Sequence, residues 1–296
     1  MTEPRPLDRT AIVYVIFLCL LWALQQVAVK LAAPDIPSLT QAAIRSFVAT
    51  AILTVYALRT TPGLTARDGS LWPGLAAGVL FSLEFVALFL ALKYTGAGRV
   101  TLFLYSAPFF VALGLPLLLP NERLSRLQWL GLTASFVGVA LALGVFSGAG
   151  RADARGDLLA LAAGALWGAT TLIIKTTALR RIPPVKTLLY QLGLSAPVLA
   201  AAAVFAGERV VAWPGALALA SLAFQTLVVG CFSYLAWFGL ITRYRAGEVS
   251  VFTFAAPLFG MMAGWTILGE PLTAGFVGAV ALVAAGIVLV NLPKRA

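Results

Sequence analysis

The chain contains the ten-residue segment LWALQQVAVK and, 145 positions later, the related segment LWGATTLIIK. Trp22 thereby aligns with Trp167, and Lys30 aligns with Lys175. Each copy lies inside a long apolar run that ends in a charge. A repeat of this kind in so apolar a chain predicts a duplicated bundle of membrane helices. If each half holds an odd number of spans, the second half enters the membrane upside down, as in many secondary transporters.

The composition requires most of the surface to face lipid. Of 296 residues, 61% are hydrophobic and only 11% are charged, whereas soluble domains carry about 25% charged residues. The net charge of +10 comes from Lys and Arg that lie mainly at the ends of apolar runs, which is typical of topology signals and contact with anionic headgroups. Because no basic stripe or aromatic-basic module appears, we expect no nucleic-acid partner.

The reactive side chains are few. The sequence has no histidine, and its two cysteines, Cys19 and Cys231, lie inside apolar runs, where we expect small buried hydrophobes. No cluster of metal-ligating residues is present, so we expect no metal and no cofactor. The apolar run that follows the polar N-terminus is too long for a signal-peptide core, and we expect the first span to be retained.

Ten segments have the roughly 20 apolar residues that cross a bilayer. The breaks between them carry proline, glycine or asparagine, and none of the loops could hold a soluble domain. We place the spans near residues 10–31, 38–58, 71–92, 99–119, 127–147, 157–179, 185–206, 213–241, 248–268 and 272–291. Pro108, Pro116, Pro197 and Pro257 fall inside spans and should kink them.

The basic residues predict the orientation. With these spans, thirteen Lys and Arg fall on the face shared with the N-terminus and five on the opposite face. Since cytoplasmic loops are the more basic, both termini should be cytoplasmic in a multi-pass protein of the bacterial inner (cytoplasmic) membrane.

Ten spans divide as five plus five. The first repeat would cover residues 1–147, a periplasmic linker loop residues 148–156, and the second, inverted repeat residues 157–296. Further pairs support the division, because Pro108 in YSAPFF matches Pro257 in FAAPLF, and Glu122 in NERL matches Glu270 in GEPL. The expected fold is an all-α polytopic membrane protein with two inverted five-helix repeats around a central cavity.

The paired LW…K, AP and E–L motifs, in this order, resemble those of the EamA-type members of the drug/metabolite transporter superfamily. The resemblance covers nearly the whole chain and is closest to YddG-type exporters of aromatic amino acids in bacterial inner membranes. It implies a ten-helix bundle, a central cavity, alternating access and outward movement of small metabolites. The resemblance does not determine the substrate. It is compatible with a monomeric protein.

Four ionisable residues lie within spans, where such groups are costly and often functional. Lys30 and Lys175 are near helix ends on opposite membrane faces, where their long stems favour snorkelling anchors. At 1.5 Å per residue, Arg45 lies about 10 Å and Glu84 about 12 Å from the outer end of its span, so the two share a level. They could form a structural ion pair, or Glu84 could hold a substrate ammonium or a coupling proton.

Polar and aromatic residues cluster at middle depth in both halves. Thr170 and Thr171 of the second half stand where Gln25 and Gln26 stand in the first. A zwitterion with an aromatic side chain needs such polar groups together with ring faces. The candidate substrate-binding residues are Trp22, Gln25, Gln26, Phe81, Glu84, Phe85, Thr101, Tyr105, Trp167, Thr171, Tyr190, Gln191, Ser233, Tyr234, Trp237 and Phe254.

Two kinds of exporter fit this inventory. The first exports small metabolites, above all aromatic amino acids, and the alternative exports drugs or planar cations held by cation–π contacts. An intramembrane enzyme is disfavoured because the aspartates all lie at loops or helix ends. A channel is disfavoured because no filter-like loop appears.

Overall fold

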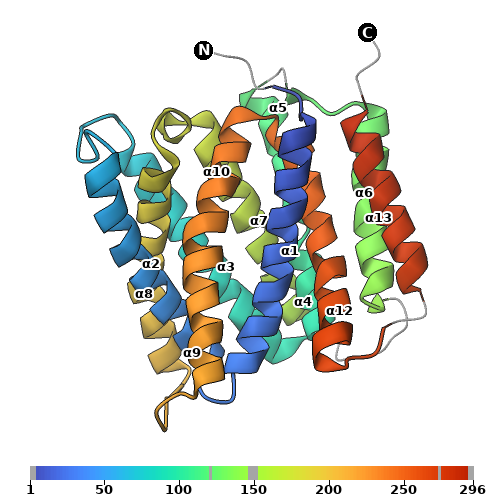
Figure 1. Ribbon diagram of the computed structural model, residues 1–296. Coiled ribbons are helices and arrows are strands. Elements are labelled where there is room, and N and C mark those ends of the chain that lie inside the picture. The colour runs from blue at the N-terminus through green and yellow to red at the C-terminus, as the bar shows by residue number, and fades with distance from the viewer. Residues whose placement is uncertain (1–4, 120–121, 146–152, 273–274, 293–296) are drawn as a thin grey trace.

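The computed structural model of the chain describes residues 5–119, 122–145, 153–272 and 275–292 and forms an all-helical bundle (Figure 1). The helices of the N-terminal half are α1 (Arg9–Ala32), α2 (Ser38–Thr60), α3 (Leu71–Tyr94), α4 (Ala97–Leu104), α5 (Ala107–Leu118) and α6 (Arg126–Ala142). Those of the C-terminal half are α7 (Ala154–Thr176), η3 (Ala178–Arg181), α8 (Pro184–Phe205), α9 (Ala216–Ala223), η4 (Phe224–Ser233), α10 (Tyr234–Arg243), α11 (Ala246–Val251), η5 (Phe252–Phe254), α12 (Ala255–Leu268) and α13 (Phe276–Asn291).

Eight helical segments of the described chain are long and apolar enough to cross a membrane. They correspond to eight of the ten expected spans, with α4 and α5 forming one segment, α9 to α10 another, and α11 to α12 a third. The other two expected spans, 127–147 and 272–291, coincide with the shorter apolar helices α6 and α13. Large apolar side chains point outward, among them Leu117, which is 84% exposed, and Phe205, which is 92% exposed. Such a surface suits lipid.

Two spans are broken at matching places. The helix stops at Tyr105 and restarts as α5, whose first turn holds Pro108. In the second half, α11 gives way to the 3₁₀ turn η5 just ahead of Pro257 in α12. Because proline lacks an N–H, it is tolerated in a first helical turn and interrupts a helix elsewhere. Pro116 and Pro197, by contrast, lie inside helices that continue through them.

One helical break was not expected from the sequence. The span that begins with α9 continues as the π-helical segment η4 before it becomes α10. A π-helical stretch often marks a functional position, because it changes the phase of the side chains that follow. Here it ends at Ser233, immediately before the aromatic residues of α10.

Helices from the two halves pack against each other. α1 packs on α12 and α7 packs on α5, while α2 packs on α8 and α6 on α13. The last contact is close, because a Cβ added at Gly286 would stand 2.4 Å from the carbonyl oxygen of Gly131. Only small residues allow helix backbones to approach in this way.

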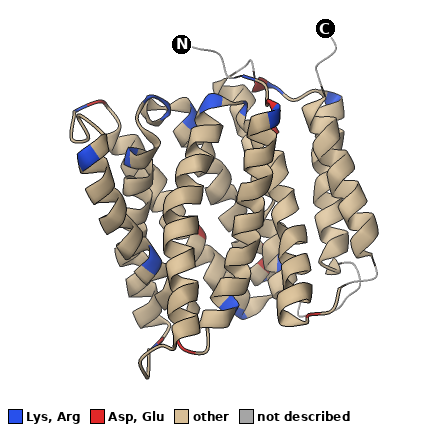
Figure 2. Cartoon of the chain, in the orientation of Figure 1, with Lys and Arg blue, Asp and Glu red and all other residues tan. Residues whose placement is uncertain are grey.

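The two described ends of the chain lie at the same end of the bundle, here named the terminal end (Figure 1). Lys and Arg gather mainly at this end (Figure 2). The chain is fixed there by Asp8, which caps α1 by accepting the N–H of Ala11 over 2.8 Å, and by a backbone bridge between Arg5 and Tyr244. Residues 146–152, which contain most of the expected linker loop 148–156, lie outside the described residues.

Candidate substrate cavity

A cavity of about 140 Å³ lies among helices from both halves. Its wall is formed by α1, α3, α4, α7, α8 and α10 together with the residue after α4. The lining residues are Trp22, Gln25, Gln26, Phe81, Glu84, Phe85, Leu88, Leu104, Tyr105, Trp167, Thr170, Thr171, Ile174, Gln191, Tyr234, Trp237 and Phe238.

The cavity brings together twelve of the sixteen residues predicted from the sequence. These are Trp22, Gln25, Gln26, Phe81, Glu84, Phe85, Tyr105, Trp167, Thr171, Gln191, Tyr234 and Trp237. Their meeting follows from helix depth, since all were chosen at the middle of a span. That they bind a substrate stays a prediction.

The other four predicted residues do not line this cavity. The ring of Tyr190 lies against Gly74, and its hydroxyl is 3.2 Å from Ser70 Oγ. Phe254 is fully buried against Phe136. Ser233 is buried behind the wall, and Thr101 is half-buried on α4. These four residues were chosen at a suitable depth along their spans, but they lie on helical faces that do not line the cavity.

Four apolar lining residues were missed by the sequence analysis. Leu88 follows Glu84 by one helical turn, and Ile174 follows Thr171 by three residues. Leu104 and Phe238 are chain neighbours of predicted residues. Helical spacing from the predicted residues would have found the first two. A search for polar and duplicated aromatic residues could not find the others.

Edge-to-face aromatic pairs stiffen the wall. The ring centres of Trp22 and Trp237 are 5.2 Å apart at 71°, and those of Tyr105 and Trp167 are 5.6 Å apart at 77°. The Trp22 indole N–H donates to Ser233 Oγ over 3.0 Å. Each pair joins a residue of one half to a residue of the other, so the two repeated tryptophans meet partners across the cavity.

Several polar side chains of the wall have no hydrogen-bond or ion-pair partner in the described part of the chain, among them Gln191 and Glu84. Gln191 is fully buried, and neither its amide nitrogen nor its amide oxygen forms a hydrogen bond. Glu84 forms no ion pair within 4.0 Å. A buried polar group without a partner costs about 1–3 kcal/mol. A ligand that bonds to the buried amide of Gln191 would recover that cost, and the half-buried Glu84 lies in the same wall.

The ion pair between Arg45 and Glu84 that their depth allowed is not formed. No Asp or Glu of the described residues lies within 4.0 Å of the Arg45 guanidinium. The Arg45 Cζ atom lies instead over the ring of Phe85, 5.3 Å from its centre.

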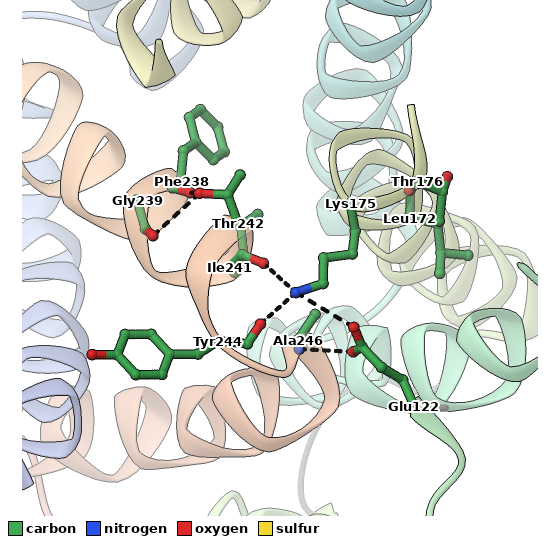
Figure 3. Close-up of polar contacts among 10 residues, drawn as sticks. All are labelled: Glu122, Leu172, Lys175, Thr176, Phe238, Gly239, Ile241, Thr242, Tyr244 and Ala246. Atoms are coloured by element: carbon green, nitrogen blue, oxygen red, sulfur yellow. Dashed lines mark hydrogen bonds and ion pairs between the residues drawn. The ribbon is translucent and has the colours of Figure 1, made fainter. Parts of the chain in front are cut away.

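The structure separates the two lysines of the repeat. Lys30 is an exposed end-of-helix residue, as expected, and pairs with Glu270 over 2.6 Å. The prediction that Lys175 is a snorkelling anchor is wrong. Its side chain is fully buried, and Nζ lies 3.5 Å from Glu122 Oε1 (Figure 3). Because the side chain is 0% exposed, its ammonium does not reach the headgroups.

Lys175 also caps a helix end (Figure 3). Its ammonium donates to the carbonyl of Ile241 over 2.9 Å and to the carbonyl of Tyr244, both at the C-terminus of α10. Glu122 Oε2 accepts the N–H of Ala246, at the start of α11, over 3.2 Å. The cation thus meets helix-end carbonyls and the anion meets a helix-start N–H, as the backbone dipoles favour.

Comparison with known proteins identifies the family. The model of the EamA-like transporter family matches the chain twice, over residues 9–144 and 154–292. The chain belongs to the EamA-like transporter family. Both matches fall on helical repeats that contribute to the cavity. The family identifies this EamA-like protein as a multi-pass membrane transporter.

Relatives of this EamA-like protein share nearly its full length. The uncharacterized transporter YvbV of Bacillus subtilis is 27% identical over 98% of the chain and 94% of its own length. The uncharacterized transporter YoaV of the same organism is 22% identical over 92% of the chain and 94% of its own length. An uncharacterized transporter of Archaeoglobus fulgidus is 26% identical over 85% of the chain and 86% of its own length.

A solved crystal structure shares the fold. It superposes with a TM-score of 0.80 over 96% of both chains at 19% sequence identity.

Proposed function

We propose that this EamA-like transporter exports amino acids, above all those with aromatic side chains, across the bacterial inner membrane by alternating access. The observation that carries the proposal is the pair of unpartnered polar groups, Gln191 and Glu84, within a wall of aromatic rings. A zwitterion offers a cation to the carboxylate and hydrogen-bond acceptors to the amide. Its aromatic side chain can pack edge-on against the rings.

Each polar group has a proposed role. Glu84 would bind the ammonium group, while Gln25, Gln26 and Gln191 would bind the carboxylate. Trp22, Tyr105, Trp167 and Trp237 would enclose the side chain; all eight residues except Gln26 are at least partly buried. The volume of about 140 Å³ favours a small metabolite, since pockets for drug-sized ligands measure about 300–1,000 Å³.

The proposed fold has ten spans arranged as two inverted five-helix repeats, residues 1–147 and 157–296, joined by a periplasmic loop. The matched helix breaks near Pro108 and Pro257 support it. So does the reciprocal packing in which α1 contacts α12 as α7 contacts α5. The basic terminal end supports termini in the cytoplasm.

Export of drugs or planar cations is the second candidate. Glu84 favours it, because this is the one carboxylate among the residues that line the described cavity. Aromatic faces would hold a delocalised cation as readily as an aromatic side chain. In that case Glu84 is indispensable as the counter-charge, and the neutral variant Glu84→Gln should lose all export of cations.

The test is transport in proteoliposomes. Vesicles loaded with labelled phenylalanine or tryptophan should empty faster when they contain the protein, and the variant Tyr105→Leu should slow this efflux. Tyr56→Leu is the matched control, because Tyr56 is 51% exposed on the outer surface. Absence of flux for every amino acid, with flux of cationic dyes, would reject the proposal in favour of the second candidate.

A further inference from the structure

The most unusual polar group outside the cavity wall is Arg45. Its side chain on α2 is 1% exposed, and its Nε and one terminal nitrogen are buried without a hydrogen bond. A buried charge is normally paired, because the loss of hydration is otherwise uncompensated. The Phe85 ring offers a cation–π contact but no acceptor for the N–H groups.

Arg45 stands directly behind the cavity wall. Phe85 lies between them, since its ring contacts the guanidinium and also lines the cavity. Glu84, the neighbour of Phe85 in the chain, brings a negative charge to the same stretch of wall. An anionic group in the wall and a cationic group behind it thus both adjoin Phe85, and an α-amino acid also carries one charge of each sign.

We propose that Arg45 is the counter-charge of the substrate carboxylate and determines specificity for carboxylate-bearing amines. This rests on the proposed function and deepens it. A rotation of the Phe85 ring would let the guanidinium reach the ligand, where its planar fork fits a carboxylate. Gln191 and its unpartnered amide would complete the site.

The test compares ligands that share the aromatic ring and the amine but differ in whether they carry a carboxylate. Binding of phenylalanine, its methyl ester and phenethylamine is measured on the purified protein and on Arg45→Gln and Arg45→Lys. Phenylalanine should bind the native protein at least about tenfold more tightly than its ester, which corresponds to about 1.4 kcal/mol. Arg45→Gln should bring this ratio close to one, and Arg45→Lys should keep part of it.

Four results would overturn the proposal. A ratio that is unchanged in folded Arg45→Gln, or equal binding of acid and ester to the native protein, would show that Arg45 does not recognise the carboxylate. Equal loss of affinity for all three ligands in both variants would assign Arg45 a structural role. Absence of binding by any of the three to the native protein would reject the proposed function as well.

A second inference comes from the reciprocal Lys–Glu pairs. Lys175 of one half pairs with Glu122 of the other, and Lys30 pairs with Glu270. In the repeat, Lys30 matches Lys175 and Glu122 matches Glu270, so the two ion pairs are equivalent. Each joins the lysine of one half to the glutamate of the other.

The two equivalent pairs differ in burial. The side chains of Lys175 and Glu122 are 0% and 4% exposed, whereas those of Lys30 and Glu270 are 56% and 47% exposed. The buried pair lies at the terminal end, beside the lining residue Ile174, and caps the junction of α10 and α11. In the described chain, Lys30 Nζ has only Glu270 as a partner and does not cap the equivalent junction of α3 and α4.

We infer that the two pairs are alternating latches. In this structure the Lys175–Glu122 pair, with its helix-capping bonds, holds the terminal end closed. In the reciprocal conformation the Lys30–Glu270 pair would close the opposite end. The cost of burying one ion pair would be offset by exposing the other to water, so the two conformations would differ little in free energy. The inference rests on the alternating access of the proposed function.

Sided labelling of a cavity cysteine tests the latch without any substrate. Thr170, a buried lining residue, is replaced by cysteine in a Cys19→Ser, Cys231→Ser chain. The protein carries a tag at one terminus, and the proteoliposomes are separated by the side of the membrane on which this tag is exposed. A charged, membrane-impermeant thiol reagent should label at least about tenfold faster from the side opposite the tag. Added Glu122→Gln should increase labelling from the tag side by a similar factor, and Lys30→Met should not.

Unchanged sidedness in both Glu122→Gln and Lys175→Met, with each variant folded by thermal melting, would overturn the latch. Equal labelling of the starting protein from both sides would also overturn it and would count against alternating access. Faster labelling from the tag side would show that the terminal end is open, and it would also overturn the latch.

Discussion

Trp22 on α1 donates its indole N–H to Ser233 Oγ over 3.0 Å, and Ser233 donates in turn to the carbonyl of Val229 over 2.7 Å. This chain of bonds fixes an indole of the N-terminal half to the π-helical segment of the C-terminal half. Because the Trp22 ring also meets Trp237 edge-to-face, the bond sets the shape of the aromatic wall.

Removing this bond should loosen the wall without destroying it. A neutral hydrogen bond contributes about 0.5–1.5 kcal/mol, so Ser233→Ala should weaken binding of phenylalanine about two- to tenfold. Trp22→Phe should weaken it at least as much, because it removes the same bond and part of the ring, and the double variant should be no worse than Trp22→Phe alone. Titration calorimetry on the native protein, the two single variants and the double variant measures these affinities as a double-mutant cycle. Additive losses would contradict the coupling.

Glu84→Gln should weaken the binding of ligands that carry an ammonium group and leave the binding of other ligands unchanged. A hydrogen bond to a charged group contributes about 1.5–3 kcal/mol, so phenylalanine should bind at least about tenfold more weakly to the variant. 3-Phenylpropionate, which lacks the ammonium, should bind both proteins equally. Competition assays with the two ligands measure this difference. The same loss for both ligands would remove Glu84 from ammonium recognition.

The sequence predicted the helices and the composition of the cavity because depth along a span is read directly from residue number. Twelve predicted residues line the cavity for this reason. Helical face is harder to read, because lipid and cavity both accept aromatic side chains. Tyr190 and Gln191 are adjacent in the chain and equally deep, yet only Gln191 lines the cavity.

Burial could not be predicted for the repeated lysines. Lys30 and Lys175 have matching positions in matching segments, so sequence alone assigns them one role. Their environments differ because Lys175 lies within the bundle, beside the C-terminus of α10, whereas Lys30 lies at an exposed end of α1. Nor did any sequence signal mark the π-helical segment of residues 224–233.

Asp68 should make stability depend on pH. Its carboxylate accepts from Lys186 Nζ over 2.8 Å and from the N–H of Ser70 over 3.0 Å. The hydrogen bond from Lys186, followed by that from Ser70, holds the pKa of Asp68 well below its usual value of 3.8. The folded protein therefore binds this proton more weakly than the unfolded chain, and the stabilisation is present above about pH 4 and lost as pH falls below it.

The corresponding variant is Asp68→Asn. It should melt at a lower temperature than the native protein at pH 7, because it loses the charged partner of Lys186. The difference should shrink as the pH falls from about 5 to 3, because the Asp68 carboxyl takes up its proton in the unfolded chain before it does so in the folded protein. Thermal melts in detergent across this range measure the difference. A gap in melting temperature that stays constant down to pH 3 would contradict the assignment.

The contact between α6 and α13 should tolerate no added carbon at Gly286. A Cβ there would stand 2.2 Å from Ser135 Oγ and 2.4 Å from the carbonyl oxygen of Gly131. The second of these is backbone and cannot move aside, so Gly286→Ala should push the helices apart. Overpacking of this kind costs about 1–3 kcal/mol, and the melting temperature should fall by several degrees.

Gly278 provides the matched control on the same helix. A Cβ at Gly278 meets nothing within 4 Å, and alanine is favoured over glycine in a helix by about 1 kcal/mol. Gly278→Ala should therefore melt at the native temperature or above it. If both variants lost stability equally, the cause would be an effect common to this helix, such as its contact with lipid, rather than the close approach of Gly286 to Gly131. A loss confined to Gly286→Ala would show that the two helices depend on this glycine contact.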